Sequence, residues 1–161
     1  SFPTRRSSDL FSTTRVLKGN TVKKEEIRSR LFDMQDIEFK KFQCKLIPGV
    51  NSDTVIGVRT PLLRKLAKEI FKSDDYEEFI RDLPHEYYEE VNLHGMIICM
   101  VSDYDEAIHE VNKLLPYVDN WATCDLLSCK KAFKDNLDKL ETDVKRWISS
   151  GDTYTDRKSV V

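Results

Sequence analysis

The sequence predicts an all-α fold, arranged as an α-solenoid of short antiparallel helix pairs. Helical periodicity runs through the chain from Val22 onward, and no segment alternates as a strand would. Only five glycines and five prolines occur in 161 residues, which argues against a turn-rich β sandwich. Helix-like units end at Ile47-Pro48, Leu83-Pro84 and Leu115-Pro116, and the prolines lie 36 and 32 residues apart. This spacing is typical of helical-pair repeats, and short helices with short loops fit such a stack better than one long bundle.

The first half of the chain is expected to contain three helices with one long loop. Their apolar stripes cover residues 22–34, 36–47 and 60–72. Residues 48–58 hold the loop, which is marked by proline and glycine. Thr60 is expected to cap the third helix, with Pro61 at the first helical position, where no backbone donor is needed.

The second half predicts five further helices, over residues 74–83, 84–101, 103–118, 119–128 and 130–150. The second of these has an apolar latter half, which is typical of a buried helix. Asp103 or Asp105 is expected to cap the third, and Gly151 to end the last one.

The two ends of the sequence differ in character from the interior. Residues 1–10, "SFPTRRSSDL", resemble the translation of a sequencing adapter, and residues 156–161, "DRKSVV", resemble the same adapter read on the opposite strand. We therefore expect residues 11–155 to form the domain, with the natural C-terminal part missing.

Charge and hydropathy limit the classes of partner. The net charge of −2 excludes a globally basic nucleic-acid binder, so any DNA-binding surface must be a local patch. No run of 18 apolar residues is present, so no membrane span is expected.

The cysteines and histidines predict neither a disulfide nor a metal site. The four cysteines contain no C-x-x-C pair: Cys44, Cys99, Cys124 and Cys129. Reduced thiols in a cytoplasmic protein are the expected state. The three histidines, His85, His94 and His109, are too scattered in sequence to form a metal motif, and no cofactor is expected.

The segment "VDNWATCD" is the main candidate for a functional site. Asp119 or Asn120 can cap a helix in which Trp121 and Asp125 share one face, because residues four apart are neighbours on a helix. A carboxylate beside an aromatic plane can hold a cation or stabilise developing positive charge. Spacing alone favours the alternative, in which Trp121 is a core residue and Asp125 a solvated one.

Basic side chains around the helix over residues 60–72 are candidates for phosphate contacts. They are Arg59, Arg64, Lys65 and Lys68, and a similar group occurs in "FKKFQCK" with Lys40, Lys41 and Lys45. A solvated helix face explains each of them equally well.

Three blocks of sequence together resemble the DNA alkylation repair enzyme family, the AlkD-like DNA glycosylases. They read "LIPGVNSDTVIGVRTPLLRKLAKEIFK", "DLPHEYYEEVNLHGMII" and "LPYVDNWATCDLLS", in the order of the family. The resemblance implies a superhelix of HEAT-like repeats that holds duplex DNA on its concave face. It also implies excision of N3- and N7-alkylated purines, without a flipped-base pocket and without a cofactor.

The family's site residues correspond to three positions of this sequence. Its cleft aspartate and nearby tryptophan match Asp125 and Trp121, and its DNA-backbone arginine is in register with Arg157 of "TYTDR". The family's second cleft tryptophan is absent here. The resemblance implies that Asp125 stabilises an oxocarbenium-like transition state, as carboxylates do in glycoside hydrolysis.

The leading hypothesis is thus a monomeric, cytoplasmic glycosylase acting on alkylated double-stranded DNA, with Arg59, Arg64 and Lys65 as further DNA contacts. Two alternatives remain open at this point. One is a non-catalytic helical-repeat module that binds DNA or protein, and the other is an inactive fragment of the enzyme.

Overall fold

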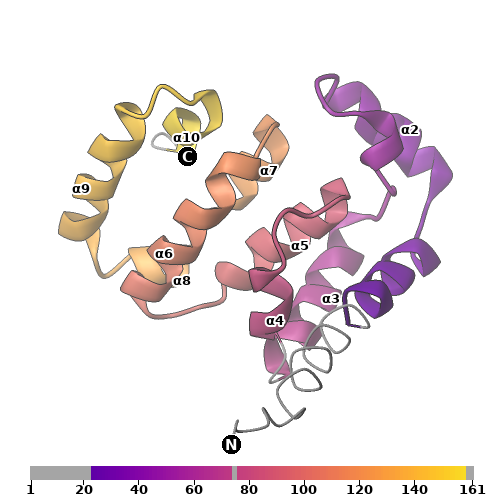
Figure 1. The fold of residues 1–161 in the computed structure, drawn as a ribbon, viewed down its shortest axis with the longest axis horizontal. Helices are drawn as coiled ribbons and strands as arrows, with labels where there is room; N and C mark the ends of the chain where they lie inside the picture. Colours follow the sequence, from indigo (N-terminus) through magenta and orange to yellow (C-terminus); the bar gives the residue numbers. More distant parts are fainter. Residues whose placement is uncertain (1–22, 74–75, 159–161) are drawn as a thin grey trace, which may run out of the picture.

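The computed structural model describes residues 23–73 and 76–158, and these ranges contain helices and no strand (Figure 1). The prediction of an all-α fold is confirmed. Among the described residues, a helix covers residues 23–33. The elements that follow are α2 (Ile37–Leu46), η1 (Ser52–Thr54), α3 (Thr60–Lys72), α4 (Tyr76–Arg81), α5 (Tyr88–Ile98), α6 (Tyr104–Leu114), η2 (Leu115–Tyr117), α7 (Trp121–Leu126), α8 (Lys130–Phe133), α9 (Leu137–Ile148) and α10 (Thr153–Lys158).

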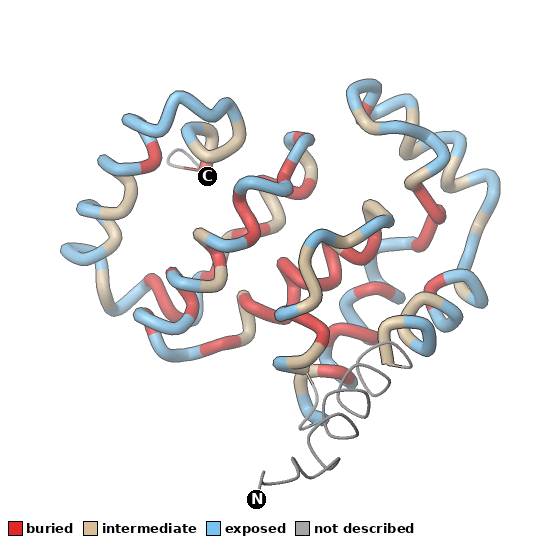
Figure 2. The backbone as a smooth tube through the Cα atoms, in the orientation of Figure 1, coloured by how far each residue is buried: buried red, intermediate tan, exposed pale blue. Residues whose placement is uncertain are grey.

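Helix α5 lies at the centre of the fold, with α3 and α4 on one side and α6 and α7 on the other (Figure 1). It is the most deeply buried helix, as its apolar latter half predicts (Figure 2). Gly95 permits the contact with the chain after α7, because a Cβ atom there would lie 2.8 Å from a methyl group of Leu127. The core is therefore built around α5, and the flanking helices extend from it as a curved row.

The two ends of this row are much less buried (Figure 2). Helix α2 contains no buried residue, and Trp147 is the one buried residue of α9. Within the described ranges, no helix combines the length and hydrophobicity needed to cross a membrane.

The structure confirms some of the helix caps that the sequence predicts. Asp103 and Asn120 are the caps of α6 and α7, and their side chains accept from the backbone N–H groups of Glu106 and Thr123. The expected cap at Thr60 is wrong: Thr60 is already helical, and the N-cap is Arg59, which makes no side-chain capping bond. Pro61 then occupies the second helical position, where its missing N–H is equally harmless.

The helix expected over residues 130–150 is two helices. Helix α8 ends at Phe133 and α9 begins at Leu137. Asn136 lies in the break, and its side-chain amide donates to the carbonyl of Ala132 at 3.0 Å. Such bonds let asparagine compete with helical hydrogen bonding, which explains the break.

The expectation of reduced thiols is wrong for one pair of cysteines. Cys99 at the end of α5 and Cys129 before α8 form a disulfide across 30 residues of sequence. Cys44 and Cys124 are free. The pairing depends on how α5 and α8 meet, which the local spacing of cysteines does not reveal.

The structure describes part of one adapter-like terminal segment and none of the other. Residues 1–10 lie outside the described residues. Residues 156–158 complete α10, and Gly151 precedes this helix with a positive φ of 73°, as expected of a helix stop.

Candidate functional site

A cleft of about 560 Å³ opens between α2, α3, α5 and α7. Its apolar wall includes Phe39, Leu46, Leu63, Met96, Trp121 and Leu126. Its polar side chains include Gln43, Arg64, Tyr88, Asn92, Asp125 and Ser128. The cleft thus combines apolar surface with one cation and one anion, contributed by α3 and α7.

Helix α7 presents Trp121 and Asp125 to this cleft. The Asn120 side chain caps the helix by accepting from the Thr123 N–H at 2.9 Å. Thr123 is buried and donates its hydroxyl to Asn92 Oδ1 on α5 at 2.7 Å. Because this inner face is fixed to α5, the residues on the other face, Trp121 and Asp125, line the cleft together, as their spacing predicts.

Asp125 is paired with Arg157 of α10. Arg157 Nε lies 2.8 Å from Oδ1 of Asp125, and Nη2 lies 2.8 Å from Oδ2. The hydrogen bonds to Asp125 raise the pKa of Arg157 above its ordinary value. Arg157 Nη1 makes no hydrogen bond within the described residues, so part of the guanidinium remains available to an anion.

Trp121 is not a core residue, so the structure rejects that alternative. Its side chain is 43% exposed, and its indole N–H donates to the carbonyl of Leu46 at 3.0 Å. Leu46 is the last residue of α2, where helix carbonyls lack partners within the helix. The indole therefore links the start of α7 to the end of α2 at the cleft.

The three basic residues expected to contact DNA occupy different places. Arg64 lines the cleft. Arg59 forms an ion pair with Asp36, with both Nε and Nη2 at 2.8 Å from Oδ2, and lies over the ring of Phe39. Lys65 is exposed on α3 but does not line the cleft. Only Arg64 thus lies in the same cleft as Asp125.

The sequence profile of the DNA alkylation repair enzyme family matches residues 24–161. The chain belongs to this family. Neither the curated proteins nor the solved structures gave a match. Membership assigns the protein to DNA alkylation repair, and the matched region contains Trp121, Asp125 and Arg157.

Local sequence patterns do not predict that three polar residues of this family member lie at the cleft. Gln43 donates to the hydroxyl of Tyr88 at 3.1 Å, and this bond links α2 to α5. Burial raises the pKa of Tyr88. Asn92 is buried between Tyr88 and α7. Its polar side chain within the apolar helix "VNLHGMII" is the one signal that could have identified this group.

Two of the three histidines, which are too scattered in sequence to form a metal motif, lie side by side in the repair protein. Nε2 of His85 and Nδ1 of His94 are 2.9 Å apart, and Phe79 stacks on His85. Burial lowers the pKa of His85 to about 4 and that of His94 to about 3, so both are neutral at pH 7. Within the described ranges, no three metal-binding side chains gather at one place.

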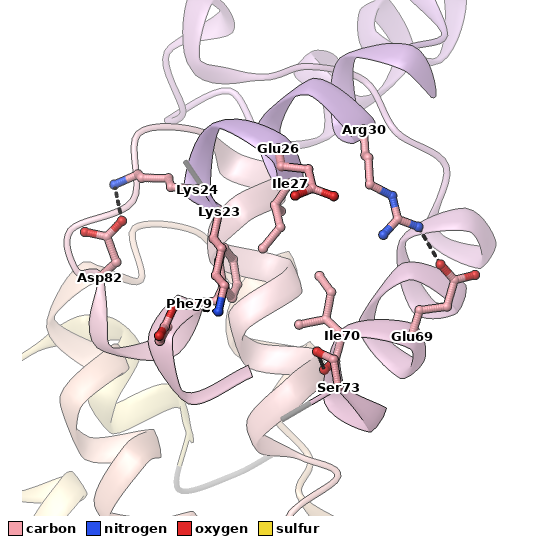
Figure 3. A pocket seen from close by; sticks show the side chains of 11 residues that line it. Lys23, Lys24, Glu26, Ile27, Arg30, Glu69, Ile70, Ser73, Phe79 and Asp82 are labelled. Carbon is pink, nitrogen blue, oxygen red and sulfur yellow. Dashed lines mark hydrogen bonds and ion pairs between the residues drawn. The ribbon is translucent and has the colours of Figure 1, made fainter. Parts of the chain in front are cut away.

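A second cavity of about 240 Å³ lies between the helix over residues 23–33, α3 and α4 (Figure 3). Its rim carries ion pairs, including Lys24 with Asp82 at 3.0 Å and Arg30 with Glu69. It shares no lining residue with the cleft that contains Asp125. All three basic side chains among its lining residues are in ion pairs, so it offers no unpaired cation comparable to Arg64.

Proposed function

We propose that the protein is a DNA glycosylase that removes N3- and N7-alkylated purines from double-stranded DNA. The observation that carries this proposal is the placement of the Asp125 carboxylate and the Trp121 indole on one face of α7, at one cleft. Membership of the DNA alkylation repair enzyme family supports alkylated DNA as the substrate. No cofactor is part of the proposal.

The proposed reaction is hydrolysis of the bond between C1′ of the deoxyribose and the alkylated ring nitrogen. The bonding electron pair leaves with the cationic base, which becomes neutral, and positive charge develops on the sugar. Asp125 stabilises this charge electrostatically. Water then adds to C1′ and loses a proton, which completes the hydrolysis without a strong general acid.

Trp121 has a different part in this mechanism. An aromatic face attracts a cation, with a strength of about 0.5–2 kcal/mol that increases as water is excluded. The alkylated purine carries its charge before the reaction, whereas an ordinary purine is neutral. The indole would therefore favour binding of the lesion over the normal base.

Arg157 and Arg64 are the proposed phosphate contacts nearest to Asp125. Arg157 retains Nη1 for a phosphate oxygen while its other two nitrogens orient the carboxylate. Arg64 lies at the same cleft on the α3 side. Arg59 and Lys65 lie outside it and are proposed as weaker, more distant contacts.

The wider arrangement belongs to the same proposal. The curved row of helices is proposed to form a HEAT-like superhelix that holds the duplex on its concave side. A monomer in the cytoplasm is the proposed state.

The test is release of 7-methylguanine and 3-methyladenine from methylated duplex DNA. We expect Asp125→Asn to lower the release rate by roughly 100-fold, the scale of losing one transition-state electrostatic contact. Asp105→Asn, an exposed aspartate on α6, is the matched control and should keep full activity. Salt-dependent DNA binding by the unmodified protein without base release would instead favour a non-catalytic binding module.

A further inference from the structure

Helix α2 exposes apolar side chains that the protein's own core does not use. Phe42 is 56% exposed and Leu46 is 42% exposed. None of the apolar side chains of α2 belongs to the hydrophobic core or to the residues packed against it. Exposed apolar surface of this kind marks a contact surface for a partner when it is contiguous.

Two exposed apolar side chains of α2, Phe42 and Leu46, lie on the side of the cleft. Phe39, Gln43 and Leu46 line it, and Phe42 is one turn before Leu46 and in ring contact with Phe39. Ile37 is nine residues before Leu46, which at about 3.6 residues per turn places it on the opposite side of the helix. The apolar surface at the cleft thus continues outward onto Phe42.

Polar contacts hold α2 in place. Asp36, the N-cap of α2, pairs with Arg59, Gln43 donates to Tyr88, and the carbonyl of Leu46 accepts from Trp121. The bond from Trp121 attaches the last turn of α2 to the first residue of α7. Phe42 therefore lies within one helical turn of the position where Trp121 contacts α2.

The charges around Phe42 favour a nucleic acid as the partner. Lys41 and Lys45 flank it in sequence, and Lys41 is paired only with Glu38 of the same helix. Lys45 is exposed and makes no hydrogen bond or ion pair within residues 23–73 and 76–158. An aromatic side chain beside an unpaired lysine suits a base next to its phosphate, because bases stack on aromatic rings and lysine neutralises the backbone.

We propose that Phe42 is an apolar wedge that stacks against a displaced base of the damaged duplex, beside the lesion held at Asp125. Leu46 extends this apolar contact, and Lys45 contacts the phosphate of the same strand. Phenylalanine and leucine are residue types that proteins insert at unstacked base steps. This inference rests on the proposed function, since it requires a duplex bound at the cleft.

The experiment compares two DNA duplexes by fluorescence anisotropy, one intact and one with a tetrahydrofuran abasic analogue. Phe42→Ala should weaken binding of the abasic duplex on the order of tenfold, because stacking on an aromatic ring is lost. Binding of the intact duplex, whose bases remain stacked, should change by less than about twofold.

Two further variants define the specificity of the effect. Ile37→Ala removes an equally exposed side chain from the opposite side of α2, and it should leave both affinities unchanged. Lys45→Ala should weaken binding of both duplexes and lower the salt dependence by about one counterion. Neither Phe42 nor Ile37 is buried, so both variants should fold.

Base release by the unmodified protein separates this inference from the proposed function. If the protein releases alkylated bases but Phe42→Ala binds the abasic duplex normally, the wedge is wrong and the glycosylase proposal stands. If binding of the abasic duplex depends on Phe42 but no base is released, the wedge stands and the glycosylase proposal fails. An equal loss of affinity in Ile37→Ala would also overturn the wedge.

Discussion

Asp125 and Arg157 come from different helices and meet through two hydrogen bonds of 2.8 Å each. The pair joins α7 to α10 and orients both carboxylate oxygens. A two-pronged contact of this kind requires the planar guanidinium, which lysine does not have. The orientation of the proposed catalytic carboxylate thus depends on a residue 32 positions further along the chain.

Replacing Arg157 by lysine tests whether this orientation matters. Arg157→Lys retains the charge but loses the paired geometry, so we expect base release to fall by roughly tenfold with an unchanged salt dependence of DNA binding. Arg157→Ala should lower both. The measurements are single-turnover excision and binding at several salt concentrations. Full excision by the lysine variant would show that charge alone suffices.

Glu89 is expected to be essential for stability. It is almost fully buried, and its carboxylate accepts from the backbone N–H groups of Ile56, Gly57 and Val58 at 2.8, 2.7 and 3.3 Å. Glu89→Gln replaces one acceptor oxygen by a donor, so we expect a loss of about 2–3 kcal/mol in the free energy of unfolding, measured by urea denaturation.

A matched control for Glu89 is the exposed Glu77, which pairs with Arg81 one turn along α4. Glu77→Gln should change the unfolding free energy by less than about 0.5 kcal/mol. Equal effects in the two variants would mean that the segment before α3 does not depend on the buried carboxylate.

The His85–His94 pair predicts acid sensitivity. Burial lowers the two pKa values to about 4 and about 3, below the value of about 6.5 in an unfolded chain. The unfolded state therefore binds more protons as the pH falls below about 6.5. We expect stability to be fully present above this pH and to fall progressively down to pH 4 and 3, as measured by urea denaturation.

Removal of the pair should reduce this sensitivity. The double variant His85→Phe with His94→Leu should lose much of the pH dependence between about pH 6.5 and 4.5, above the range in which carboxylates titrate. His109 is exposed, so His109→Gln is the control and should retain the slope. An unchanged slope in the double variant would contradict the buried pair.

The Cys99–Cys129 disulfide closes a loop of 30 residues, for which loop entropy gives a stabilisation of about 3–4 kcal/mol. We expect two reactive thiols, Cys44 and Cys124, in denaturant without reductant. Adding reductant should expose four and lower the melting temperature. Four thiols before reduction would rule the disulfide out.

Sequence patterns predicted those features that depend on neighbouring residues. The cap at Asn120 and the shared face of Trp121 and Asp125 follow from spacings within one helix. The break between α8 and α9 was missed because the apolar stripe continues across it, while the bond from Asn136 to Ala132 is a local detail of geometry. The periodicity of apolar residues predicts which face of a helix is buried better than it predicts where the helix ends.

Contacts between distant segments could not be predicted in this way. The Cys99–Cys129 disulfide and the His85–His94 contact depend on how helices and turns meet in space. The Asp125–Arg157 pair joins two positions that family resemblance had assigned to different partners. Only the three-dimensional arrangement shows that one residue orients the other.

The hydrogen bond from Trp121 to Leu46 has a practical consequence. The chain has two tryptophans, and Trp147 is 3% exposed whereas Trp121 is 43% exposed. Acrylamide added to the solution should therefore quench mainly the emission of Trp121. A ligand that covers the cleft should shield that emission, so the protein carries an optical probe at the point where α2 meets α7.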